Sequence, residues 1–349
     1  MKKKLLLLLL CIPLIGIGQT DFGKFKMIIK STYSAKEVFG DIQKDSLLEK
    51  IVTKYDENGN RIENIYDDEN GRFSSAVYKY DENGNRIEMK VYYENEKSYK
   101  KYIYKYDENG NRIESISYDK NGELYKKNIY KYDENGNIIE NTEYDKNGKL
   151  EDKEIYKYDE NGNETEYKRY VENGELWWYE VSKYDENGNK IENTEYDENG
   201  ELETKTISKY DENGNETEYK HYDENGKLWW HGVSKYDENG NKIELKEYRN
   251  GELEYKEISK YDENGKRIEF KEYDENGKLE HKELFKYDEN GKIIEFKEYD
   301  ENGKLDYTLV DQYKYDKLNN WIEIKTGNAK KYNLVKITKI TERQIEYYE

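Results

Sequence analysis

The sequence predicts an all-β fold, a repetitive antiparallel β-meander of about twenty strands that is elongated or curled into a spiral or shell-like sheet. The first observation behind this prediction is a motif of the type Lys-Tyr-Asp-Glu-Asn-Gly that recurs every 25 or 26 residues. The second is a looser copy midway through each unit, which makes the structural step about 13 residues, one strand and one turn. The tyrosines of the first motif lie at positions 55, 80, 106, 132, 158, 184, 210, 236, 261 and 287.

The composition explains how such a sheet is held together. Only 34% of the 349 residues are hydrophobic, 39% are charged, and 39 residues are Tyr. Disordered chains share the high charge but are poor in aromatic residues. A tyrosine ring buries apolar area while its hydroxyl remains hydrated or hydrogen-bonded. We therefore expect Tyr to replace Leu and Val as the main packing residue.

The N-terminus predicts export. Residues 2–4 form a basic region, and residues 5–15 form an apolar region shorter than the ~20 residues of a membrane-spanning helix. Small residues then precede Gln19. Residues 1–18 are therefore predicted to be a signal peptide that is cleaved near Gly18. The mature chain is expected in the periplasm, at the outer surface or outside the cell, without a membrane span.

Lipidation of Cys11 is the alternative at this end of the chain. It is disfavoured because Leu10 occupies a position where a small residue is needed. Cys11 is the single cysteine, so the mature chain is expected to contain neither disulfides nor thiol chemistry.

The two turns of a unit are expected to differ. Asn-Gly is a strong hairpin signal because both residues tolerate the positive φ of tight turns. We expect a two-residue loop at the first turn and a three-residue loop at the second. The expected pairs are Tyr106 with Ile113 and Asp107 with Arg112 at the first turn, and Tyr118 with Leu124 and Tyr273 with Leu279 at the second.

Two regions lie outside the array of repeats. Residues 19–50 lack the turn motif and are expected to form a capping strand region. The array itself covers residues 51–312, and residues 313–349, where the motif decays, are expected to form closing strands.

The motif Tyr-x-Tyr-Asp-x-x-Gly-Asn resembles the YD or RHS-type repeat, and the chain is similar to secreted RHS-like proteins of the Bacteroidetes. The motif occurs at residues 78–85, 104–111, 130–137 and 156–163. The resemblance implies a long sheet that curls into a shell, and in large RHS proteins such a shell encloses a toxin. Because no domain follows residue 349 in this sequence, we expect the toxin function not to carry over. MORN-type repeats are a weaker similarity, at residues 170–178 and 222–230.

Charge and residue types exclude several function classes. A net charge of −19 disfavours nucleic acid and anionic lipid as partners, because binding either one requires clustered Lys and Arg. The acidic residues occupy repeated turn and strand settings, so no pair is singled out for acid–base catalysis. We interpret His221, His231 and His281 as surface variants. The sequence thus predicts no catalytic site, no cofactor and no metal site, and Asp-Glu-Asn-Gly is interpreted as turn chemistry rather than a calcium loop.

Two pairs of adjacent tryptophans stand out from the repeat. Trp177-Trp178 and Trp229-Trp230 lie in near-identical stretches 52 residues apart. Because neighbouring strand residues point to opposite faces, we expect one Trp of each pair to pack inward and the other to be presented outward. Trp178 and Trp230 are the members expected to form a regular ligand platform, although packing in the core is the favoured interpretation.

We therefore expect an exported, non-enzymatic repeat protein that acts as a binding or scaffold surface for a protein at the cell surface. Glycan binding through the Trp and Tyr platforms is the first alternative. A relative of RHS toxin-enclosing shells that lacks a toxin domain is the second.

Overall fold

The computed structural model describes residues 24–93, 98–330 and 335–348, so the predicted signal peptide lies outside the described residues. The described chain forms 24 β-strands and no helix. The strands are β1 Phe25–Val38, β2 Asp41–Tyr55, β3 Arg61–Asp68, β4 Phe73–Tyr80, β5 Arg86–Tyr93, β6 Ser98–Tyr106, β7 Arg112–Tyr118, β8 Leu124–Tyr132, β9 Ile138–Asp145, β10 Leu150–Tyr158, β11 Glu164–Val171, β12 Leu176–Tyr184, β13 Lys190–Asp197, β14 Leu202–Tyr210, β15 Glu216–Tyr222, β16 Leu228–Tyr236, β17 Lys242–Arg249, β18 Glu252–Tyr261, β19 Arg267–Asp274, β20 Leu279–Tyr287, β21 Ile293–Tyr299, β22 Leu305–Tyr315, β23 Trp321–Lys330 and β24 Lys336–Tyr347.

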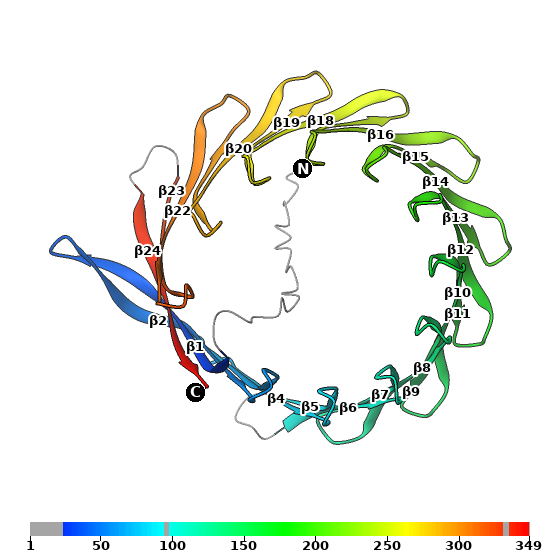
Figure 1. Ribbon diagram of the computed structural model, residues 1–349, viewed down its shortest axis with the longest axis horizontal. Coiled ribbons are helices and arrows are strands. Elements are labelled where there is room, and N and C mark those ends of the chain that lie inside the picture. Colours follow the sequence, from blue (N-terminus) through cyan, green and yellow to red (C-terminus); the bar gives the residue numbers. More distant parts are fainter. Residues whose placement is uncertain (1–23, 94–97, 331–334, 349) are drawn as a thin grey trace.

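Each strand pairs antiparallel with the next, as in a meander, and the predicted fold class is confirmed (Figure 1). The sheet does not end in a free edge. β1 pairs with β24 from Phe25↔Tyr347 to Ser34↔Lys339, and this pairing closes the 24 strands into a ring. Closure satisfies the backbone groups that an open spiral would leave exposed at its two ends. The segments predicted as caps therefore contact each other through β1 and β24.

The ring has two rims. The turns that follow Lys-Tyr-Asp form the inner rim in Figure 1, and the alternate turns form the outer rim. The hairpin of β1 and β2 projects outward beyond its neighbours at the outer rim (Figure 1). We call residues 35–48 the arm, because β1 pairs with β24 only as far as Ser34 and β2 pairs with β3 only from Glu49. Phe39, at the tip of the arm, is fully exposed.

Most turns at both rims share one geometry, a three-residue loop that ends on a glycine of positive φ. At the inner rim, Asp107 donates its N–H to Asn111 O at 2.9 Å and accepts from Gly110 N at 3.1 Å. At the outer rim, Asp119 bonds Glu123 and Gly122 in the same way. Gly110 has a φ of 83°, which an L side chain rarely adopts.

The expected alternation of turn types is therefore wrong at the inner rim. Tyr106 pairs with Arg112 rather than Ile113, and a bulge follows Lys105, which pairs with Glu114. The Asp side chain supports the longer loop where it is present, although Val171 closes the same loop without a carboxylate. Asp107 Oδ1 accepts the backbone N–H of Asn109 and of Asn111, and a two-residue loop does not contain both donors.

The expected outer-rim pairs are confirmed. Tyr118 pairs with Leu124, and Tyr273 pairs with Leu279. A two-residue Asn-Gly turn does occur at the outer rim, between β17 and β18, where Asn250 and Gly251 both have positive φ. The repeat is one residue shorter there, and the residue before Asn250 is Arg249 instead of the usual Asp-Glu pair.

A ladder of tyrosine hydroxyls connects successive turns of the inner rim. Tyr132 donates its hydroxyl to Arg112 O in the preceding unit at 2.8 Å, and eight equivalent tyrosines do the same at 2.8–3.0 Å. The ladder continues across the closure, where Tyr348 donates to Tyr55 O at 2.7 Å and Tyr347 to Asp316 Oδ2 at 2.8 Å. The tyrosine of each motif therefore holds one repeat to the next.

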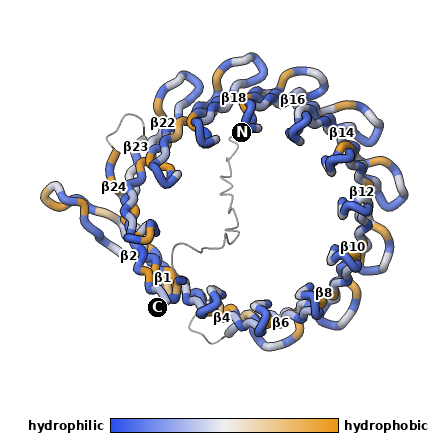
Figure 2. Tube along the Cα trace, in the orientation of Figure 1, coloured by the Kyte–Doolittle hydropathy of each residue, from blue (hydrophilic) through white to orange (hydrophobic). Residues whose placement is uncertain are grey.

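The two faces of the sheet carry different chemistry. One face, the lysine face, holds Lys-Glu-Lys triads, such as Glu192 between Lys183 at 2.8 Å and Lys205 at 3.0 Å. The other, the tryptophan face, holds Trp178, Glu180 and the buried Ser182 on β12. Figure 2 shows hydrophilic inner turns and hydrophobic positions spread along the strands around the whole ring.

This sheet has only a thin core. The buried hydrophobic side chains among the described residues are Tyr78, Tyr104, Leu245 and Ile340. Hydrogen-bonded ladders and half-buried rings therefore carry the stability that a thick core supplies in an ordinary domain.

We expect Tyr132→Phe to lower the free energy of unfolding by about 0.5–1.5 kcal/mol, because it removes the hydroxyl that pairs with Arg112 O. Urea unfolding followed by circular dichroism measures the change. Tyr125→Phe is the matched control, since the ring of Tyr125 is 64% exposed. Equal losses in the two variants would contradict a stabilising ladder.

The turn carboxylates make stability depend on pH. Amide donation from Asn137, together with its backbone N–H, lowers the pKa of Asp133 below the usual 3.8. The Asn side chain is also the largest cause of the lowered pKa at Asp159, Asp185, Asp211 and Asp237. A folded-state pKa below the unfolded value stabilises the fold above pH 3.8, and this stabilisation is lost as the pH falls through the folded-state pKa.

We therefore expect the urea midpoint to fall as the pH is lowered from about 5 to about 2. Asp133→Asn should reduce the size of this fall, because one titrating turn is removed. Urea titrations at a series of pH values provide the measurement. A midpoint that rises or stays constant on acidification would contradict the assignment.

Candidate ligand-binding surface

A row of exposed residues follows the outer rim, and the bulges create it. At each outer hairpin from β7–β8 to β21–β22 one residue has no partner on the facing strand, as Trp177 lies between Leu176, paired with Tyr170, and Trp178, paired with Arg169. The equivalent residues are Tyr125, Glu151, Trp177, Glu203, Trp229, Glu254, Glu280 and Asp306, and all are exposed. We call them the bulge row. Three aromatic rings in it thus alternate with carboxylates.

The bulges also place both members of each Trp pair on the tryptophan face. Trp177 lies against Arg169 at 4.8 Å, and Trp178 contacts Tyr167 at 5.1 Å, two residues away on the same face of β11. The expectation that the members point to opposite faces is therefore wrong, because a bulge breaks the strict alternation of side chains. Trp177 and Trp229 are the more exposed members, at 47% and 39%, while Trp178 and Trp230 are half-buried.

The platform at Trp177-Trp178, called copy one, is filled by side chains of its own chain. The Arg169 guanidinium lies over the Trp177 ring, and its Nε donates to Asp152 Oδ1 at 2.9 Å. Glu154, beside Arg169, accepts from Asn141, Tyr156 and Tyr167 at 2.8–2.9 Å. The charged groups of copy one are therefore occupied by hydrogen bonds and a cation–π contact within the chain.

The platform at Trp229-Trp230, called copy two, has shorter side chains at the same positions. The residues 52 positions after Asp152, Glu154, Tyr156 and Arg169 are Thr204, Thr206, Ser208 and His221. A cavity of about 490 Å³ lies there, lined by Glu195, Thr204, Thr206, His221, Trp229 and Trp230. His221 Nδ1 is 2.8 Å from Thr206 Oγ1, and burial lowers the pKa of His221. Burial therefore favours the neutral form of the imidazole.

A glycine explains the different path of the neighbouring tyrosine in copy two. Gly232 stands where copy one has Glu180, and a Cβ at Gly232 would lie 2.2 Å from Tyr219 Cε1. Tyr219 therefore crosses Gly232 and donates to Glu247 on β17. Its counterpart Tyr167 instead points back to Glu154 on β10.

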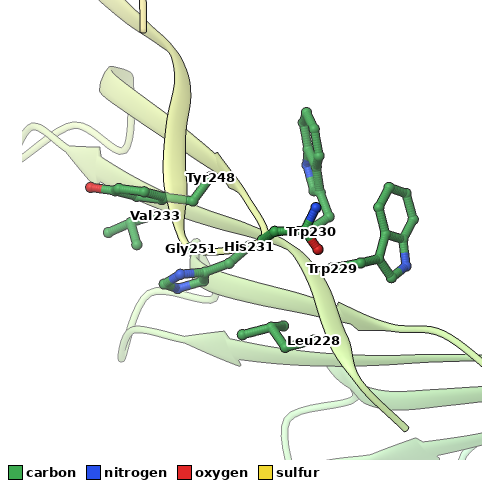
Figure 3. A pocket seen from close by; sticks show the side chains of 8 residues that line it. Leu228, Trp229, Trp230, His231, Val233, Tyr248 and Gly251 are labelled. Carbon is green, nitrogen blue, oxygen red and sulfur yellow. The ribbon is translucent and has the colours of Figure 1, made fainter. Parts of the chain in front are cut away.

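A second cavity, of about 260 Å³, lies next to the short Asn250–Gly251 turn. Its lining residues include Leu228, Trp229, Trp230, His231, Val233 and Tyr248, whose side chains are drawn in Figure 3. The His231 ring is stacked on Tyr248 at 5.5 Å, and its Nε2 is 3.0 Å from Glu218 Oε1. Hydrogen bonds from Lys209 and Lys220 lower the pKa of Glu218 to about 2. His231 thus belongs to a charged cluster on the lysine face.

The structure gives the turn aspartates a structural role. Asp133 Oδ1 accepts two backbone N–H groups and Oδ2 accepts the Asn137 amide, so the carboxylate is occupied within its own turn. Among the described residues there is also no helix long and apolar enough to cross a membrane.

Sequence reasoning missed Tyr125, Thr204, Thr206 and Gly232. A comparison of the residue after each outer-rim Leu, at steps of 25 or 26 residues, would have found Tyr125 in the bulge row. The cavity itself depends on side chains from β13 to β16, and no single motif contains them.

Comparison with known proteins gives partial matches. A family model described as the MORN repeat variant matches residues 216–229, 268–287 and 294–310, and the first stretch overlaps the predicted MORN-like residues 222–230. No curated protein matches the sequence.

Among solved structures, TcdB2-TccC3 is 11% identical over 91% of this chain and 24% of that chain, with a TM-score of 0.29. TcdB2-TccC3-Cdc42 is 12% identical over 87% and 27%, with a TM-score of 0.21. A porin-like protein from Bacteroides uniformis is 10% identical over 93% and 98%, with a TM-score of 0.24. This chain therefore spans about a quarter of the TcdB2-TccC3 chains. The chain is an all-β repeat protein in which three stretches match the model of the MORN repeat variant.

We expect Gly232→Ala to destabilise the protein by about 1–3 kcal/mol, because the new Cβ must displace the Tyr219 ring. The cost should disappear when Gly232→Ala is made in a Tyr219→Ala background, and urea unfolding of the four variants in this cycle measures the coupling. Additive effects of the two changes would contradict the contact.

Proposed function

We propose that this chain is an exported, non-enzymatic binding protein whose ligand is a carbohydrate held along the bulge row. The observation that carries the proposal is the repeated presentation of exposed indoles, Trp177 and Trp229, at equivalent positions of the sheet. Sugars pack their C–H groups on aromatic faces, and flanking polar groups take their hydroxyls.

The row matches an extended ligand. Trp177 and Trp229 lie on β12 and β16, four strand spacings apart, which is roughly 19 Å along the sheet. Glu151 and Glu203 alternate with the rings and offer hydrogen-bond acceptors. One ligand that spans two weak platforms gains affinity through effective concentration.

Charge selects among carbohydrates. The formal net charge is −19, and the bulge row contributes five carboxylates, at Glu151, Glu203, Glu254, Glu280 and Asp306. An anionic polysaccharide would be repelled, so the proposed ligand is a neutral one.

A protein-interaction role is the second candidate, and the arm favours it. Among the described residues neither edge of the arm pairs with a further strand. Phe39 at its tip is fully exposed, and Leu47 near its base is 40% exposed. Free strand edges pair readily with an added strand. The relation to toxin-enclosing shells remains a prediction from the motif resemblance.

We expect the variant Tyr125→Ala, Trp177→Ala, Trp229→Ala to lose retention on an array of neutral glycans, because it removes the aromatic rings of the bulge row. Its urea midpoint should change little, because a substitution at an exposed position usually changes the free energy of unfolding by no more than about 0.5 kcal/mol.

Glu280→Ala is the matched control, as it changes a bulge residue away from the aromatic rings. Unchanged retention in the triple variant would contradict the proposal. Breakdown of a bound glycan by the purified protein would contradict its non-enzymatic part.

A further inference from the structure

Copy one and copy two differ in a way that divides their roles. They share the sequence Glu-Thr-Glu-Tyr-Lys before the turn and Leu-Trp-Trp after it. In copy one the Arg169 guanidinium covers Trp177 and is held by Asp152, so a side chain of the protein already lies on the indole. In copy two the His221 ring lies farther from the indole, with its centroid 6.1 Å from that of Trp229, and Thr204 replaces the carboxylate that would hold a cation there.

We propose that the cavity between β13 and β16 is the specific recognition pocket of this protein and takes one ring of a neutral oligosaccharide, while in copy one Arg169 occupies one face of the Trp177 ring and leaves only its exposed side to the bulge row. This inference rests on the carbohydrate-binding function proposed above. It assigns affinity and specificity to copy two. The remaining sugar rings of the ligand would lie along the bulge row.

The lining has the chemistry of a sugar site. Trp229 and Trp230, with ring centroids 5.9 Å apart, supply two aromatic surfaces at one side of the cavity. Thr204, Thr206 and His221 supply uncharged donors and acceptors, which suit hydroxyl groups. The volume of about 490 Å³ lies in the range of small-molecule pockets.

Glu195 completes the pocket and excludes anions. The residue 52 positions before Glu195 is Glu143, which accepts from Lys126 and Asn128. The residues 52 positions after that lysine and asparagine are Trp178 and Glu180, so Glu195 has no equivalent lysine beside it. Burial, with a contribution from Glu180, raises the pKa of Glu195. The carboxyl group therefore faces the cavity without a lysine partner of the kind that Glu143 has, and it is a hydrogen-bonding group for a hydroxyl rather than part of an ion pair.

The path of Tyr219 keeps the pocket open. Because Gly232 has no side chain, Tyr219 reaches across it to Glu247. In copy one Tyr167 remains against Trp178 at 5.1 Å and bonds Glu154. Two differences therefore leave space in copy two: Gly232 stands in place of Glu180, and His221 stands in place of Arg169.

The experiment converts each copy into the other in the full chain. The closing variant is His221→Arg with Thr204→Asp, which rebuilds the ion pair of copy one over Trp229. The opening variant is Arg169→His with Asp152→Thr, which removes it from Trp177. Isothermal titration calorimetry uses cellohexaose and mannohexaose as neutral probes, hexagalacturonate as the anionic probe and arginine methyl ester as a cationic one, with urea midpoints as the control for folding.

We expect the wild-type protein to bind a neutral hexasaccharide at one site per chain and to ignore hexagalacturonate. The closing variant should lose roughly tenfold or more in affinity, and the opening variant should keep the affinity and gain a second site. Equal affinity in the closing variant and the wild type, with binding lost in Trp177→Ala, would overturn the pocket while leaving the carbohydrate function intact.

Two other outcomes separate the remaining explanations. Binding of arginine methyl ester alone would overturn the sugar assignment and identify copy two as a cation site. No binding of any glycan by the wild-type protein would overturn the proposed function together with the inference. A closing variant with a lowered urea midpoint is tested again with Thr206→Glu, which fills the cavity from the neighbouring strand, and retained affinity there would also overturn the pocket.

Discussion

The three-residue turn is the constraint on which the rest of this structure depends, and at most turns a hydrogen-bonded Asp carboxylate supports it. One oxygen of Asp107 accepts two backbone N–H groups across the loop, and the other accepts the Asn111 amide. This arrangement requires a three-residue loop that ends on a glycine of positive φ. Loop length in turn fixes the register of each hairpin, so a local side-chain contact repeated along the chain sets the step of the whole ring.

Register has consequences at both rims because most of these hairpins contain a bulge. At the inner rim the bulge leaves the motif tyrosine directed toward the preceding unit, where Tyr132 bonds Arg112 O. At the outer rim the bulge exposes one residue per unit and turns adjacent side chains such as Trp177 and Trp178 to the same face. The inner rim is therefore uniform and holds the ring together, while the outer rim is free to vary. Variation in the bulge row, from Glu203 to Trp229, changes the surface without touching the ladders.

The two Trp platforms share a sequence frame but differ in the side chains around them. In copy one, Asp152, Glu154 and Arg169 form a self-satisfied network over the indole. In copy two, Thr204, Thr206 and His221 leave a cavity instead. Charged groups that already pair with one another have few hydrogen-bonding positions left for a ligand. Hydroxyls and an imidazole beside a cavity can donate to a ligand and accept from it. The same backbone thus carries a closed and an open version of one site.

The sequence by itself determined the all-β class, the 13-residue step and the outer-rim pairs such as Tyr118 with Leu124, because each depends on contacts within one hairpin. It also identified the Trp pairs as the departure from the repeat. It did not determine the inner-rim register, since the competition between two-residue and three-residue loops is decided by the N–H groups that Asp107 reaches in three dimensions. Only the tertiary structure decided that β1 meets β24, that both members of a Trp pair share a face, and that Thr204 and His221 border one cavity. These features depend on residues from several strands, which are brought together by the bulges and by the curvature of the ring. No motif of 13 or 26 residues contains that information.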